Sequence, residues 1–370
     1  MNVLVDTYAV AIIAVILVLF IGIFLVLIFY ATIHRVIMNR RATFDRESDE
    51  RIEPLIYDYL VEQISRKDFS DELVTRYDVA AAYRHINTMI DNIGGPERER
   101  LQSLLEVAKF RQHFFRKLRS SKPMNLAQAC IYFSQKALTD KNSVARLSRL
   151  QDHPSNVIAY ASTLALVNAT DRDSRDAAVK TFLHRQQNAS MAISDIIFKY
   201  HEKYPDKEEV AEKLMFFVMD PAVPDRTRSA VISMFPGFGF YHLSGTLYEL
   251  MLTGLDDDST GTLTATLIRV LHELSLENLS QHILHLQLWR SRFPPVRLEI
   301  ARVFSDQPDV PPLAIMMELA HDSDLEVRMT AQRAMLKPYT STLPDEIFAP
   351  GIRLEWLDMK QSGEAHVHSF

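Results

Sequence analysis

Residues 322–335 read DSDLEVRMTAQRAM, and this short stretch predicts the fold of most of the chain. Asp322 begins it, an apolar and a basic residue follow at Val327–Arg328, and small residues recur from Ala331 onward. Weaker versions of the same pattern lie upstream, which indicates an internal repeat. They are centred on Val296–Arg297 with Ala301, Thr227–Arg228 with Ala230, Leu263–Thr264 after Asp258, and Val157–Ile158 after Asp152.

The positions equivalent to Arg328 are spaced like the units of a helical repeat. They fall at 158, 228, 264, 297 and 328, and the last three gaps are 36, 33 and 31 residues. The first gap, of 70 residues, leaves room for one more unit near Ile193. A period of 31–36 residues is the length of one helix pair with two short loops.

This pattern resembles the second half of a HEAT repeat, in which an Asp precedes a Val–Arg pair and small residues let the helix pack closely. The resemblance covers residues 151–338. It implies stacked helix pairs, that is, a HEAT-like α-solenoid with an extended concave surface. It also implies that Arg228, Arg297 and Arg328 brace adjacent repeats rather than contact a ligand.

The composition predicts an all-α chain. Glycine is scarce, at 10 of 370 residues, and strict alternation of apolar and polar residues is almost absent. We expect residues 52–150 to form a helical N-terminal bundle or cap, and residues 339–370 a C-terminal cap and flexible tail. Helices are expected in the first of these segments near residues 77–92, 97–120 and 126–138.

An apolar run near the N-terminus predicts a transmembrane helix. Between Asp6 and Arg35 the chain carries no formal charge, and about 20 apolar residues suffice to span a bilayer as a helix. We place the span at about residues 8–33, within an anchor of residues 1–35. Residues 36–51 then form a charged juxtamembrane linker or a continuation of the helix. A cleaved signal peptide would need a basic start and a shorter apolar core.

The charges beside the span predict its orientation. Arg35, Arg40 and Arg41 follow it and no Lys or Arg precedes it, so the N-terminus should face outside or the periplasm and the body the cytoplasm. The single cysteine, Cys130, agrees with a reducing compartment. The simple anchor and the absence of eukaryotic sorting signals favour a bacterial inner membrane.

Neither catalysis nor nucleic-acid binding is predicted. The formal net charge is −6, so no basic excess indicates a nucleic-acid partner. The sequence contains no nucleophile elbow, phosphate-binding glycine loop, zincin helix or cysteine-pair zinc pattern. We therefore expect no enzyme and no cofactor. Cys130 lies on an apolar stripe and is expected to be a buried, unreactive thiol.

Two His–Glu dipeptides, His201–Glu202 and His272–Glu273, are the weak candidates for a metal site. The HEAT-built deoxyhypusine hydroxylases hold a di-iron centre with four such pairs on successive repeats, whereas this chain has two. A metal also requires the imidazole and carboxylate groups to converge on one centre. We predict no metal site.

One expected helix carries a dense basic stretch without acidic residues. Phe110, Phe114 and Leu118 share one face of this helix. The stretch is either a packed helix with a solvated basic face, or a surface for anionic lipid headgroups or an acidic partner. Its basic residues are Lys109, Arg111, Arg116, Lys117, Arg119 and Lys122.

Residues 234–242 read MFPGFGFYH and concentrate aromatic residues between two expected helices. Such a loop is either a partner-binding tip, because aromatic side chains dominate interface energetics, or it packs into the neighbouring repeat. Its aromatic candidates for partner contact are Phe235, Phe238, Phe240 and Tyr241.

These features together predict a single-pass, membrane-anchored scaffold or adaptor whose cytoplasmic body binds a protein partner. An integral membrane protein or an envelope-assembly component fits that description. Two alternatives stay open: a metal-dependent or lyase-type enzyme on the same scaffold, and an anionic-lipid-sensing module acting through residues 109–122.

Overall fold

The chain is helical throughout the part that the computed structural model describes. Helices account for 78% of the described residues and no strand occurs among them, which confirms the predicted all-α class. The predicted C-terminal cap and tail, residues 339–370, lie outside the described residues. The structure describes residues 2–135, 138–186, 188–254, 260–306 and 313–336.

The chain divides into two compact units, residues 1–121 and residues 122–370. The repeats are predicted from residue 151 onward, after α7 (Lys141–Leu150), whereas the second unit begins at residue 122. Helix α6 (Pro123–Ser134) packs along α8 (Asn156–Val167), and α7 contacts the same helix. Both α6 and α7 therefore belong to the second unit.

Helix α1 runs without interruption from Asn2 to Leu60. Residues 36–51 are therefore continued helix, and not a separate linker. Near its N-terminus α1 holds the one helical stretch among the described residues that is long and apolar enough to cross a membrane, with a mean hydropathy of 2.1. None of that stretch is buried against the rest of the described chain.

The C-terminal part of α1 packs on α3 (Arg76–Asn92) around a buried carboxylate, Asp78. Asp78 accepts a hydrogen bond of 2.8 Å from Ser48 Oγ and pairs with Arg51, both on α1. It also completes a capping box with Thr75 at the start of α3. One side chain therefore fixes both the start of α3 and its position on α1.

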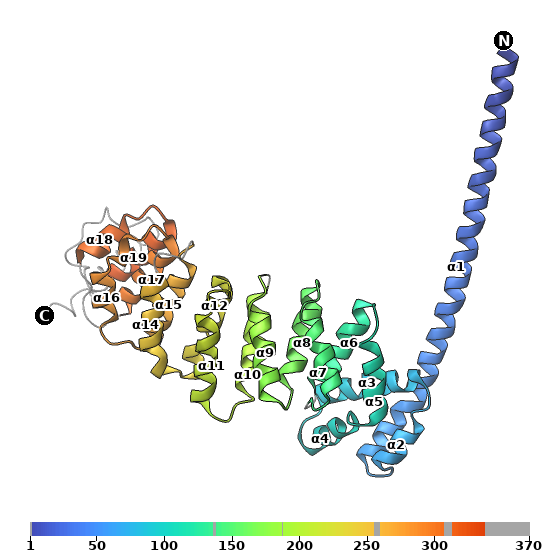
Figure 1. The fold of residues 1–370 in the computed structure, drawn as a ribbon, viewed down its shortest axis with the longest axis horizontal. Helices are drawn as coiled ribbons and strands as arrows, with labels where there is room; N and C mark the ends of the chain where they lie inside the picture. The colour runs from blue at the N-terminus through green and yellow to red at the C-terminus, as the bar shows by residue number, and fades with distance from the viewer. Residues whose placement is uncertain (1, 136–137, 187, 255–259, 307–312, 337–370) are drawn as a thin grey trace, which may run out of the picture. The chain divides into compact units, whose positions relative to one another are not determined.

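The first unit is completed by α2 (Arg66–Glu72), α4 (Gly95–Leu104) and α5 (Ala108–Lys117). These helices gather with α3 at the end of α1 that is far from the N-terminus (Figure 1). The prediction of a single helix over residues 97–120 is therefore wrong, because the chain turns between α4 and α5.

The burial of three neighbouring apolar side chains explains this break. Leu104, Leu105 and Val107 are all buried. In one continuous helix they would be spread over too wide an arc to face the same side. Hydrogen bonds three residues apart, such as Val107 N–H to the Leu104 carbonyl oxygen, tighten the chain here and bring all three inward.

We expect Asp78→Asn to destabilise the protein by about 2–3 kcal/mol, because Arg51 and Ser48 lose a charged partner. Burial by itself raises the pKa of Asp78, but hydrogen bonds from Arg51, Thr75 and Ser48 outweigh it and lower that pKa from 3.8 to about 2. This carboxylate therefore contributes stability above its unfolded pKa, and the contribution is lost as the pH falls through about 2.

Denaturant unfolding of the detergent-solubilised chain, followed by circular dichroism at several pH values, measures both effects. The difference between Asp78→Asn and the unsubstituted protein should be full near neutral pH and should close at low pH. Asp71→Asn, at an exposed position of α2, is the matched control and should leave stability unchanged. An equal loss in the control would contradict the role assigned to Asp78.

The second unit is built from helices that contact one another in chain order (Figure 1). We refer to α6, α8, α10, α12, α15, α17 and α19 as the second helices, since each packs against the next in that series. Helices α7, α9, α11, α14, α16 and α18 each pack against a second helix. Beyond α6–α8 the bounds are α9 (Arg172–Leu183), α10 (Ser190–His201), α11 (Lys207–Met219), α12 (Asp225–Ile232), α13 (Phe235–Phe238), α14 (Ser244–Gly254), α15 (Thr262–Glu273), α16 (Leu279–His285), α17 (Pro294–Ser305), α18 (Leu313–Ala320) and α19 (Leu325–Leu336).

The spacing of the second helices follows the repeat period predicted from the sequence. From α8 onward they begin at positions 156, 190, 225, 262, 294 and 325. The predicted repeat positions 158, 193, 228, 264, 297 and 328 all lie in the first turn of these helices. Side chains one period apart bond to each other, such as Tyr160 with Asp195 and Arg269 with Ser233.

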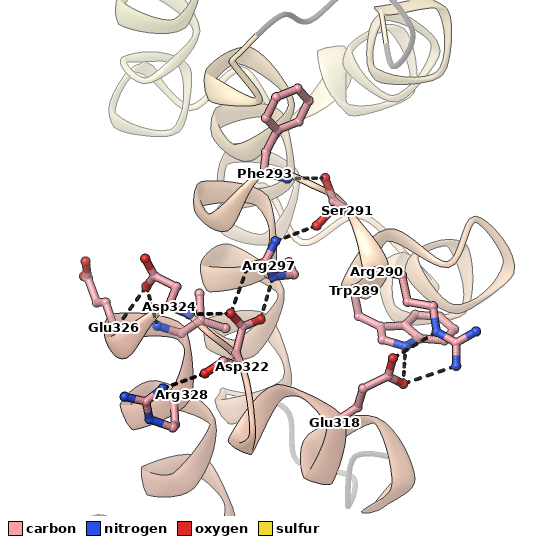
Figure 2. A network of polar contacts seen from close by, with 11 residues as sticks. Trp289, Arg290, Ser291, Phe293, Arg297, Glu318, Asp322, Asp324, Glu326 and Arg328 are labelled. Atoms are coloured by element: carbon pink, nitrogen blue, oxygen red, sulfur yellow. Dashed lines mark hydrogen bonds and ion pairs between the residues drawn. The ribbon is translucent and has the colours of Figure 1, made fainter.

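Arg297 joins two consecutive helix pairs (Figure 2). From α17 it donates to both carboxylate oxygens of Asp322, at 2.5 and 2.8 Å, and to the carbonyl oxygen of Ser291 at 2.6 Å. Asp322 lies in the turn between α18 and α19. The bracing role predicted for Arg297 therefore holds, whereas Arg228 and Arg328 bond within their own helix pairs.

Arg175, at the start of α9, repeats this local geometry and was missed by the sequence analysis. It donates to the carbonyl oxygen of Ala169, six residues earlier, as Arg297 and Arg328 do to theirs. Asp171 caps the helix in front of it. An Asp four residues before an Arg, as in Asp171 and Arg175 or Asp324 and Arg328, could have indicated this position. It was missed because Arg175 falls between the expected repeat positions.

We expect Arg297→Met to destabilise the second unit by about 3–5 kcal/mol, because it leaves the buried Asp322 carboxylate without its charged partner. The side chains of Arg297 and Asp322 are only 12% and 8% exposed. Arg302→Met, on the same helix but 45% exposed, should cost under about 1 kcal/mol. Denaturant unfolding of both variants makes the comparison, and equal losses would show that Arg297 is not a brace.

Candidate protein-binding face

The second helices leave one side uncovered, and the residues on that side change character along the unit. Near the C-terminal end of each helix an equivalent position is apolar on the first three helices and polar or basic on the next four. These positions are Ile131, Leu164 and Phe198, then Ser233, Arg269, Arg302 and Arg333.

The first three second helices carry six uncovered apolar side chains, which we refer to as the apolar face. On each helix two of them lie seven residues apart, which places them on one side, two turns from each other. Five are between 48% and 85% exposed, and Leu164 is half-buried. The set is Met124 and Ile131 on α6, Val157 and Leu164 on α8, and Met191 and Phe198 on α10.

A hydrogen bond between Tyr160 and Asp195 crosses from α8 to α10 within the apolar face. Burial, together with the neighbouring Asp195 carboxylate, raises the pKa of Tyr160 to about 12. The phenol therefore stays protonated at neutral pH and remains the donor. This bond holds the uncovered sides of α8 and α10 next to each other as one surface.

The later second helices carry charges on the same side, and those charges are paired. Arg269 donates to Ser233 at 2.9 Å, and Arg302 donates to Glu326 at 3.2 Å. A shallow groove of about 590 Å³ lies here, lined in part by Met329. This half of the surface is therefore a mixed, internally neutralised region and not a cation-rich site.

A second groove, of about 500 Å³, lies between α9 and α11 and surrounds Asp176. Asp176 accepts hydrogen bonds from Tyr200 at 2.7 Å, from Tyr204 and from Lys213. Burial by itself raises the pKa of Asp176, but these donors outweigh it and lower the pKa. The cluster ties α9, α10 and α11 together, so we assign it to the packing of the repeats. Sequence analysis did not find it, because its members are far apart in the chain.

The two His–Glu candidates lie on different second helices, α10 and α15. The His201 ring stacks on Phe238 at 4.3 Å between centroids, and burial lowers the pKa of His201. Each carboxylate pairs with a cation of its own helix, Glu202 with Lys199 and Glu273 with Arg269. No group of three or more His, Cys, Asp or Glu side chains able to hold a metal occurs among the described residues.

The predicted basic stretch is divided between packing and solvent. Phe110, Phe114 and Leu118 are buried, as expected from the side of the helix that they share. Lys109 donates to the Ser70 carbonyl oxygen at 2.7 Å, so it serves the contact with α2. Lys117 is half-buried over the Phe114 ring, and Lys122 belongs to the second unit. The cations of this stretch that are exposed and lie in the first unit are Arg111, Arg116 and Arg119.

The aromatic loop packs into the core, which agrees with the second of the two interpretations that the sequence left open. Phe235 and Phe240 are completely buried and contact each other edge to face at 5.4 Å. Phe238 is half-buried against His201. Only Tyr241 of the four candidates is exposed, at 60%. Sequence alone did not distinguish the two interpretations, because both require the same aromatic residues.

We expect Phe240→Ala to destabilise the second unit by about 3–5 kcal/mol, through lost burial and a residual cavity. Tyr241→Ala, one residue further on but exposed, should change the free energy of unfolding by under about 0.5 kcal/mol. Thermal or denaturant unfolding of the two variants measures the difference. A stable Phe240→Ala protein would mean that this loop is not part of the core.

Cys130 has the environment that the sequence predicted. The thiol is buried on α6, and burial raises the pKa of Cys130 to about 12. A thiol with so high a pKa holds almost no thiolate at neutral pH, and the thiolate is the nucleophile. The described surroundings of Cys130 therefore favour a packing role.

Comparison with known proteins gives no further direction. No protein-family model matches this sequence, and the search of curated proteins also returned no match.

Proposed function

We propose that this chain is a membrane-anchored HEAT-like scaffold, in which residues 122–336 form an α-solenoid and α1 spans a bilayer. Two observations support the repeat architecture. The second helices contact one another in chain order, and their first turns carry the repeat positions predicted from the sequence. In a solenoid, each helix pair covers an apolar side of its neighbour, as these contacts require.

The observation that carries the binding role is the apolar face of α6, α8 and α10. Soluble proteins rarely leave many large apolar side chains together in water, and such patches mark interaction sites. Met124 and Met191 suit this use, because unbranched, polarisable methionine side chains adapt to different partners. We infer that a protein partner lays an apolar or amphipathic helix across this face.

The anchor defines where this binding takes place. With the N-terminus outside and the basic residues Arg35 and Arg40 retained on the inner side, the body lies in the cytoplasm, and a bacterial inner membrane suits so simple an anchor. Confinement to the bilayer raises the effective concentration of a partner held in the same membrane. We therefore propose a membrane or envelope-assembly protein as the partner. The proposal includes no catalysis and no cofactor.

Affinity purification from gently solubilised membranes, with mass spectrometry, tests the scaffold directly. The full-length chain should retain one dominant co-purifying protein. The variant Met191→Lys/Phe198→Asp should lose it by at least about tenfold, because two charges in an apolar contact cost more than 1.4 kcal/mol. Phe216→Asp is the matched control, since Phe216 is 66% exposed but lies on α11.

The outcomes separate the elements of this proposal. Loss of the partner in the double variant alone supports binding at the apolar face. Equal loss in Phe216→Asp would place the contact elsewhere on the unit. Absence of any enriched protein with the unsubstituted chain would contradict the scaffold function itself.

A further inference from the structure

The helix that carries the apolar stretch continues into the folded body without a hinge. Between Ile33, the end of the predicted span, and Ser48, the first buried residue among the described side chains of α1, the chain stays helical. No Gly or Pro occurs anywhere in residues 23–53, and these are the residues at which helices usually kink. We refer to residues 34–47 as the strut.

The strut has no packing partner of its own over most of its length. Its described side chains are exposed, apart from the half-buried Asp45, and Phe44 makes the first contact with α3 by stacking on Tyr77 at 5.5 Å. A short isolated helix is only marginally stable in water. Here both ends are extended by further helix, and Arg46 pairs with Glu50 one turn later at 2.8 Å.

Beyond the strut, several contacts prevent α1 from pivoting on the body. Ser48 and Arg51 hold Asp78, as described above. Asp49 adds bonds to Arg84 at 3.1 Å and to His85 at 3.2 Å, both further along α3. These contacts lie about two turns apart along α3, so a change in the angle between α1 and α3 would break several of them together.

We propose that the strut holds the folded helices of the first unit, α2–α5, at a fixed distance from the bilayer, so that these helices lie beyond the lipid headgroups and do not contact the lipid. Fourteen helical residues extend about 21 Å at 1.5 Å per residue. A headgroup layer occupies about 5–8 Å on each side of the hydrocarbon. A tilt of about 20° shortens the height only slightly.

This inference rests on the proposed membrane span, and it bears on the lipid alternative. The exposed cations Arg111 and Arg116 lie on α5, and Arg119 follows just after it; α5 is among the helices gathered at the end of α1 that is far from the N-terminus (Figure 1). Electrostatic attraction to anionic headgroups falls off within a Debye length of about 8–10 Å. The strut therefore keeps these residues out of reach of the headgroups.

Energy transfer in proteoliposomes tests the distance. The full chain carrying Gln112→Cys, an exposed position on α5, is labelled with a donor and reconstituted into vesicles whose anionic headgroups carry an acceptor. The unsubstituted chain, in which Cys130 is buried, controls for labelling. Two further versions carry either seven residues inserted after Ala42 or the pair Ala42→Pro/Thr43→Gly.

We expect low transfer in the labelled chain. The insertion adds two turns, keeps the helical phase and moves the label about 10 Å further away, so transfer should fall again. The Pro–Gly pair breaks the strut, so transfer should rise as the basic helix reaches the lipid. High transfer that neither change alters would overturn the strut. Chains that alkaline carbonate extracts from the vesicles would instead overturn the membrane span on which the proposal rests.

Discussion

A helix that is apolar on two opposite sides must be covered from both, and this requirement organises the second unit. Helix α8 shows it most clearly, because Ile158 and Ala165 are buried on one side of this short helix and Val167 is buried on the opposite side. Helix α6 covers one side and α10 the other. The same arrangement passes from each second helix to the next, and one apolar core extends from Val167, at the end of α8, to Met335 on α19.

The parts of the fold that the sequence predicted are those with local signals. The repeat positions were found because Asp322, Val327 and Arg328 lie close together, and the first turns of the second helices follow from that spacing. The place of α6 in the second unit was not predicted, because only its contact with α8 shows it. The break between α4 and α5 carries neither Gly nor Pro, and it arises from the burial of Leu104, Leu105 and Val107.

The candidate site was less predictable than the fold, because exposure is a property of the assembled unit. Phe235 and Phe240 were candidates for partner contact because they are aromatic and lie in a short loop, but both are buried in the core. Met191 and Phe198, spaced as in any amphipathic helix, proved to be uncovered. In a stack of helices each one has two covered sides and one open side, and hydrophobicity alone does not indicate which side a given residue occupies.

Contacts between residues one repeat apart also bear on how the protein comes to be folded. Bonds such as Tyr160 to Asp195 and Arg269 to Ser233 join each helix pair to its neighbour in the chain. Such near-neighbour topologies have low contact order and fold by propagation from any formed unit. Helix α1 precedes the second unit in the chain, so under the proposed membrane span it would reach the bilayer before the helices of that unit are made. Each helix pair would then add to the pair before it, whose apolar side is its template.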